Sequence, residues 1–283
     1  MPDNTQTRRR NARNAFVRAG FAAVVVVVLY TLLYLTEPFS PFVNSLASNI
    51  VIVGVAATSM TLAVLTSRRY DPADSPREIW SQLAIGLGLW TVAELIWAAY
   101  NLTFGEVGFT IADLFWVLAY FFFIRALFIQ YRLLFSPSRT QSFRWIVLWV
   151  VSILSLTVMI AWLLTRFTEE QWGLPLIVGA FYPAADFVIG LVALGIVHRF
   201  RGGALGLPWL GLLVFAFADL LYAVLDFTGT YSWSVTNANP LSTVADVTYI
   251  AAYLFIVLGC YAQLLLLRHG PFFVLYRAPK ETS

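Results

Sequence analysis

Charged residues are scarce in this chain. They make up 12% of its 283 residues, whereas a typical soluble domain carries about 25%. Hydrophobic residues make up 60%. Because so little charge is available to cover the surface of a water-soluble fold, this composition indicates an integral membrane protein.

Lysine, histidine and cysteine are also rare, and each shortage excludes a kind of site. The one lysine, Lys280, is close to the C-terminus, so no predicted membrane helix can carry the Schiff base of a retinal protein. His198 and His269 fall at helix ends without the cysteine or carboxylate company of a zinc or haem site. Cys260 has no partner for a disulfide in the chain and stands in an apolar run, so we expect it to pack.

Catalytic motifs are missing as well. The sequence has no H-E-x-x-H motif, P-loop, G-x-S-x-G motif or glycine-rich dinucleotide loop. We therefore predict that the protein is not an enzyme, and the sequence points to no particular cofactor. Its basic residues are those expected of loops on the inner side of a membrane, so nucleic acid is not an expected partner.

Long apolar runs fill most of the chain. A helix needs about 20 mostly apolar residues to cross the hydrocarbon core. Breaks rich in charge, proline or glycine divide the sequence into eight such runs, and we predict an all-α membrane protein with eight transmembrane helices. The basic stretch 1–18 precedes the first run, which is long enough to be a retained helix instead of a cleaved signal. The predicted ranges are 19–36, 44–67, 79–101, 110–134, 145–165, 174–197, 206–227 and 242–267.

The arginines predict the orientation of these helices. Loops on the cytoplasmic side are enriched in lysine and arginine. With the N-terminus inside, nearly every basic residue falls on the inner side, including those of the two tails, 1–18 and 268–283. Only Arg166 falls outside and only Arg125 falls within a span. Both termini are therefore predicted to be cytoplasmic.

Two short motifs occur twice in the same order. Residues 93–98, Ala-Glu-Leu-Ile-Trp-Ala, correspond to 218–223, Ala-Asp-Leu-Leu-Tyr-Ala. Residues 112–116, Ala-Asp-Leu-Phe-Trp, correspond to 245–249, Ala-Asp-Val-Thr-Tyr. We predict an internal duplication of four plus four helices, 19–134 and 145–267, in parallel orientation.

Carboxylates stand inside the predicted spans, where each costs a few kcal/mol or more unless it has a partner, a water-filled cavity or a task. Most fall in the outer halves of their helices, and each of these leads an aromatic stripe at helical spacing. If these faces converge, they form an outward-facing acidic and aromatic pocket for a cation or a polar ligand with a flat body. The predicted ligand-binding residues are Glu94, Trp97, Asn101, Asp113, Trp116, Tyr120, Asp219, Tyr222, Asp246, Tyr249 and Tyr253.

Simpler roles are also open to these residues. Asp113 and Asp246 stand at predicted helix starts, where a capping role suffices. Tryptophan and tyrosine also form belts at membrane interfaces, and any of the other acids can serve plain bonding between helices. Arg125 and Asp186 enter their helices from the same side to a similar depth, so we predict a buried ion pair between them.

The motifs at 93–97, 112–116, 218–222 and 245–253, together with Tyr182-Pro183-Ala184-Ala185-Asp186, resemble a known membrane region. It is the multi-helix sensor region of bacterial diguanylate cyclases and phosphodiesterases, the GGDEF and EAL proteins, and the likeness covers about residues 79–267. The resemblance implies a signal-input module in the bacterial inner membrane with an unknown ligand. In that family an output domain should follow the last helix, whereas only 268–283 follow here. We therefore expect either a stand-alone relative that signals through a partner or a fold that has been put to another use.

The leading prediction is thus a membrane sensor or binding module that admits a small ligand, lipid or pigment from the outer side. Its expected partners are membrane lipid, the ligand, and a signalling protein or a second copy of the chain. An ion-coupled or proton-coupled transporter is the alternative, although the inner helix halves contain few of the polar residues that a path would need. A structural subunit of a membrane complex is the third possibility.

Overall fold

The computed structural model describes residues 4–105, 109–135, 173–200, 203–231 and 239–270. Within these ranges all regular structure is helical. The helices are α1 (Asn4–Thr36), α2 (Pro41–Ser67), α3 (Ser75–Phe104), α4 (Ile111–Leu134), α6 (Leu174–Phe200), α7 (Leu207–Phe227) and α8 (Pro240–His269), with a 3-10 turn at Ala204–Gly206. The predicted span 145–165 lies outside the described residues.

Seven helices in the described ranges are long and apolar enough to cross a membrane, which indicates a multi-pass membrane protein. Most boundaries agree with the predicted ones within a few residues. The start of α1 is the exception, because the helix begins at Asn4 and not at residue 19. The basic stretch contains no proline or glycine between Asn4 and Arg18, so nothing interrupts the helix where the apolar run begins.

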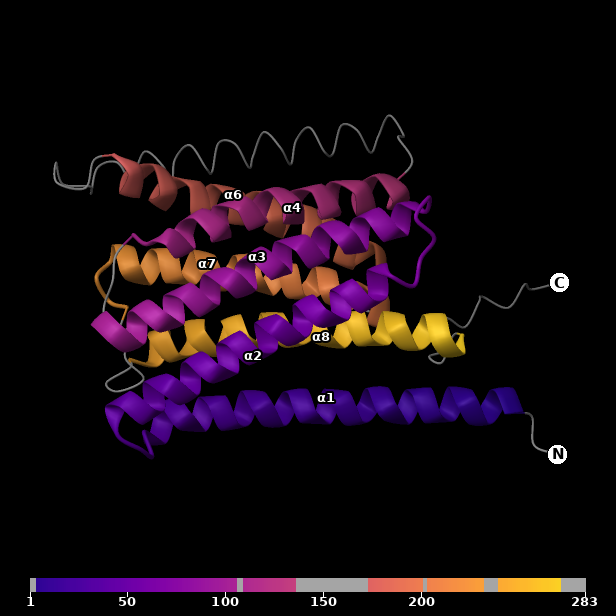
Figure 1. The fold of residues 1–283 in the computed structure, drawn as a ribbon, viewed down its shortest axis with the longest axis horizontal. Helices are drawn as coiled ribbons and strands as arrows, with labels where there is room; N and C mark the ends of the chain where they lie inside the picture. Colours follow the sequence, from indigo (N-terminus) through magenta and orange to yellow (C-terminus); the bar gives the residue numbers. More distant parts are fainter. Residues whose placement is uncertain (1–3, 106–108, 136–172, 201–202, 232–238, 271–283) are drawn as a thin grey trace.

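The long helices lie side by side in a bundle, and helices that follow one another directly in the chain run in opposite directions (Figure 1). α3 packs on α4 and α2, and α7 packs on α8 and α6. Two further contacts, of α2 with α8 and of α4 with α6, join these two groups. α1 lies at the edge and leans mainly on α8. α1 begins, and α8 ends, at the same end of the bundle (Figure 1).

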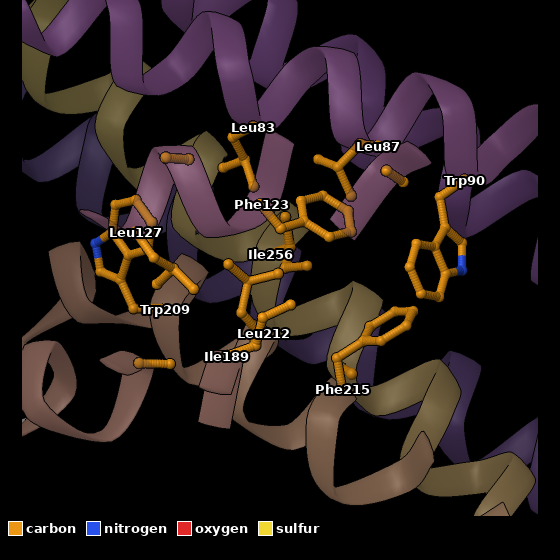
Figure 2. Close-up of a cluster of buried hydrophobic side chains, with 14 of the residues drawn as sticks. Leu83, Leu87, Trp90, Phe123, Leu127, Ile189, Trp209, Leu212, Phe215 and Ile256 are labelled. Carbon is orange, nitrogen blue, oxygen red and sulfur yellow. The ribbon is translucent and has the colours of Figure 1, made fainter. Parts of the chain in front are cut away.

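The bundle interior is apolar along much of its length (Figure 2). Trp90 and Phe215 meet edge to face at one end of this core, with ring centroids 4.8 Å apart. Trp209 and Leu127 lie at the other end, and aliphatic side chains together with the ring of Phe123 fill the space between (Figure 2). The aromatic end of the core is the end next to the buried acids.

Candidate functional site

Glu94 is buried between α3 and α8, with 4% of its surface exposed. Its Oε1 atom accepts hydrogen bonds from Trp90 Nε1 at 3.1 Å, from Tyr253 Oη at 3.1 Å and from Tyr249 Oη. Trp90 Nε1 also lies 2.7 Å from Tyr249 Oη. One carboxylate oxygen is therefore surrounded by ring donors from its own helix and from α8.

Tyr120 joins two further acids. Its hydroxyl on α4 donates to Asp186 Oδ1 on α6 at 2.6 Å and lies 3.3 Å from Asp219 Oδ2 on α7. Both Tyr120 and Asp186 are 1% exposed. Asp186 Oδ2 is buried too and has no hydrogen-bond partner in the described part of the chain. Three helices thus meet at one tyrosine hydroxyl and two carboxylates.

Asp113 has the capping role that was open to it. Its Oδ2 accepts from the backbone N–H of Thr110 at 2.7 Å, and Thr110 Oγ1 accepts from the backbone N–H of Ala112. Its other oxygen accepts from Tyr182 Oη at 2.9 Å. The cap satisfies the first turn of α4, and the tyrosine ties that turn to α6.

Asp246 does not cap α8. The helix begins at Pro240, and the side chain of Asn239 accepts from the backbone N–H of Ser242 in the capping position. Asp246 Oδ1 instead accepts from Tyr222 Oη and, at 2.9 Å, from Tyr231 Oη. Burial raises the pKa of the Tyr231 phenol well above its usual value, and the charge of Asp246 adds to this, so Tyr231 keeps its proton and donates.

Aromatic rings connect these acids into one cluster. Trp90 lies 5.3 Å from Tyr120 and 6.5 Å from Trp116, measured between ring centroids. Phe215 lies 4.7 Å from Tyr249 and 5.0 Å from Tyr253. These separations are those of favourable aromatic pairs, so the acids share an aromatic surrounding instead of standing in separate sites.

Every predicted ligand-binding residue is buried or half-buried, but the partners differ from those expected. Tyr249 and Tyr253 follow Asp246 on the same face of α8, yet both donate to Glu94 on α3. Trp97 packs on Trp116 of α4, at 5.8 Å between ring centroids. The aromatic residues therefore serve the acids of other helices more than their own.

Asn101 belongs to a different group of polar side chains. Its Oδ1 accepts from Ser45 Oγ at 3.0 Å and from Asn49 Nδ2 at 3.2 Å, both on α2. This network joins α2 to α3 near the helix ends. Among the described contacts of Asn101, none is to a carboxylate of the acid cluster.

The predicted ion pair between Arg125 and Asp186 is wrong. Arg125 pairs with Glu78 at 2.7 Å, and their side chains are 62% and 46% exposed. Asp186 meets α4 at Tyr120, which is five positions before Arg125 and therefore points about 140° away around the helix. Arg125 instead reaches the first turn of α3, where Glu78 lies.

Sequence reasoning left several contacting residues out of the site. Trp90, Tyr182 and Phe215 each stand four residues before an acid, which is the spacing of residues on one helix face. The same helical periodicity could therefore have predicted them as members of the site. Tyr231 lies beyond the end of α7, where no helical period applies.

The cluster contains acidic side chains and no described basic side chain. Among the described residues the only ion pair is that of Arg125 and Glu78, so the described partners of the buried acids are uncharged hydroxyl, indole and backbone donors. The described ranges contain no group of three or more histidine, cysteine or acidic side chains placed to hold a metal ion. Carboxylates beside aromatic faces suit an organic cation better than a transition metal.

No protein-family model, curated protein or solved structure matches this chain. Its function is therefore inferred from the residues of the site and their contacts.

Proposed function

We propose that this protein is a membrane-embedded ligand-binding module of the sensory kind, which holds a small organic cation beside Glu94. One observation carries the proposal: buried acids from four or more helices share an aromatic cluster and receive hydrogen bonds but no positive charge from the described residues. Anionic groups are costly inside a membrane. A cation with a flat body would supply the missing charge and stack on the rings.

The sensory part of the proposal rests on the motif resemblance to the input regions of bacterial GGDEF and EAL proteins. We propose a bacterial inner-membrane protein without catalytic activity, in which ligand binding shifts α3 against α8. The Glu94 bonds to Tyr249 and Tyr253 support this coupling, because they are the contacts that a ligand would compete for. A separate protein partner would receive the shift.

We also propose eight membrane spans with both termini in the cytoplasm. α4 ends at the end of the bundle where α1 begins, whereas α6 begins at the opposite end, as eight alternating spans require (Figure 1). The helix-end arginines gather at the end that holds the start of α1, as expected of a cytoplasmic side. These are Arg68, Arg69, Arg77, Arg132, Arg199 and Arg268.

Matching contacts support the proposed duplication. In the sequence alignment of the two halves, Tyr253 corresponds to Tyr120 and Asp219 to Glu94. Tyr253 donates to Glu94, and Tyr120 lies within bonding distance of Asp219, so the halves exchange equivalent bonds. The helix packing repeats as well, because α2 meets α3 and α8 in the way that α6 meets α7 and α4.

Transport is the second candidate, favoured by the unpartnered oxygen of Asp186 deep in α6. The apolar core opposes it: Leu83, Leu87, Leu212 and Ile256 fill the bundle on one side of the acid cluster (Figure 2). A polar solute leaving the cluster in that direction would have to cross this layer. Binding without passage is therefore the function that we put first.

Cysteine labelling tests the orientation. Ser40, between α1 and α2, and Ser75, at the start of α3, are exposed, and the native Cys260 is buried and can be replaced by alanine. In intact cells a membrane-impermeant maleimide should label Ser40→Cys and not Ser75→Cys. Both should react after permeabilisation. Labelling of Ser75→Cys in intact cells would contradict a cytoplasmic N-terminus.

Native mass spectrometry of the protein purified in mild detergent tests the ligand site. Wild-type protein should retain a small organic cation, and Glu94→Gln should lose it, because the amide keeps the size of the side chain but removes its charge. Glu78→Gln is the matched control, since it removes an exposed acid outside the cluster. Equal retention by wild type and Glu94→Gln, or no bound molecule in the wild type, would argue against the proposal.

A further inference from the structure

Asp186 has no role in the proposed binding of the organic ligand. It lies on α6, and only one of its oxygens has a described partner, Tyr120. Its Oδ2 is buried and unpartnered within the described ranges. A buried polar atom without a partner loses its hydration and receives nothing in exchange, so something absent from the chain itself is expected to satisfy it.

Asp219 lacks a full partner at the same place. A tyrosine hydroxyl has one proton to donate. Tyr120 gives it to Asp186 at 2.6 Å, so the 3.3 Å contact with Asp219 is the weaker of the two. Two carboxylates from neighbouring helices therefore share one donor, and Arg125, the basic side chain nearest in the sequence of α4, is engaged with Glu78. Like charges at this separation repel unless a positive charge lies between them.

We propose that Asp186, Asp219 and Tyr120 bind a small inorganic monovalent cation, for which Na⁺ is the probe. All these atoms are hard oxygen ligands, the type that such ions prefer. The cost of moving an ion out of water rises with the square of its charge, so a monovalent ion enters this dry setting more readily than a divalent one. The proposal does not depend on the organic ligand, because Glu94 supplies none of these oxygens and acts on the site only through its charge, which lies near that of Asp219.

Thermal unfolding of the full chain in detergent, followed by tryptophan fluorescence, tests the site. Caesium chloride, whose cation is inorganic and much larger than Na⁺, is replaced stepwise by sodium chloride at constant ionic strength. The unfolding midpoint of the wild type should rise with Na⁺, because an ion that binds only the folded state stabilises it. Asp186→Asn should lose this rise. Glu78→Gln should keep it unchanged. Glu94→Gln should keep a rise but need more Na⁺ for it, because a negative charge near Asp219 is lost while the ion ligands remain, and this separates the cation site from the proposed organic-ligand site.

A second variant keeps the test decisive if Asp186→Asn does not fold. Tyr120→Phe removes one ligand hydroxyl and retains the ring, and it should weaken the apparent Na⁺ affinity about ten-fold or more, because the loss of an outer-shell partner alone costs about that much. The proposal would be overturned if the midpoint of the wild type did not respond to Na⁺, or responded to Ca²⁺ alone. It would also be overturned if Asp186→Asn showed the same midpoint rise as the wild type, or if Tyr120→Phe had an unchanged Na⁺ affinity.

Discussion

Gly211→Ala should destabilise the protein by about 1–3 kcal/mol, the usual cost of overpacking a close contact. A Cβ atom at this position would lie 2.8 Å from the carbonyl oxygen of Ala252 and 2.9 Å from the backbone nitrogen of Ile256. These are backbone atoms of α8 and cannot turn aside as a side chain can. The substitution therefore has to separate α7 from α8, the helices that carry Asp219 and the tyrosines bonded to Glu94.

The same substitution at other glycines gives a graded set of controls. Gly86→Ala meets the ring of Phe123, with the nearest atom at 2.5 Å, and that ring can shift, so its cost should be smaller. Gly54→Ala on α2 has open space around it and should be neutral or slightly stabilising, because alanine favours the helix. Thermal unfolding midpoints in one detergent measure all three. A Gly211→Ala protein as stable as Gly54→Ala would show that α7 and α8 are not in such close contact.

Glu94→Ala should cost about 3–5 kcal/mol, the range for removing one partner of a buried charged contact. The carboxylate is the shared acceptor of Trp90, Tyr249 and Tyr253, and its loss leaves these buried donors without it. Alanine also leaves a void beside the rings. The expected result is a large fall in unfolding midpoint together with loss of the organic ligand.

Glu94→Gln separates the two effects. The amide oxygen can still accept hydrogen bonds, so most of the stability should remain, at a loss of about 1 kcal/mol. Tyr249→Phe is a matched variant on the other side of the contact, because it removes one donor and leaves the carboxylate in place. If Glu94→Ala were as stable as Glu94→Gln, the carboxylate would not be the acceptor that holds α3 to α8.

The helices and their inward faces could be predicted without coordinates. Inside hydrocarbon the backbone has to satisfy its own hydrogen bonds, so a long apolar run becomes a helix. A buried acid has to face the interior, and residues three, four or seven positions away follow it there. This is why Trp116, Tyr120, Tyr222 and Tyr253 are all at least half-buried. The first run was predicted too short because polarity marks where a membrane helix leaves the hydrocarbon, not where the helix begins.

The choice of partners was settled only by the way the helices pack. Helical periodicity says which residues share a face, but the tilt and axial offset of two helices decide which faces meet and at what level. Tyr249 and Tyr253 therefore bond to Glu94 across the bundle and not to Asp246, which shares their face. Arg125 likewise meets Glu78, because its direction around α4 leads away from Asp186. These contacts join residues far apart in the chain, and nothing within a single helix specifies them.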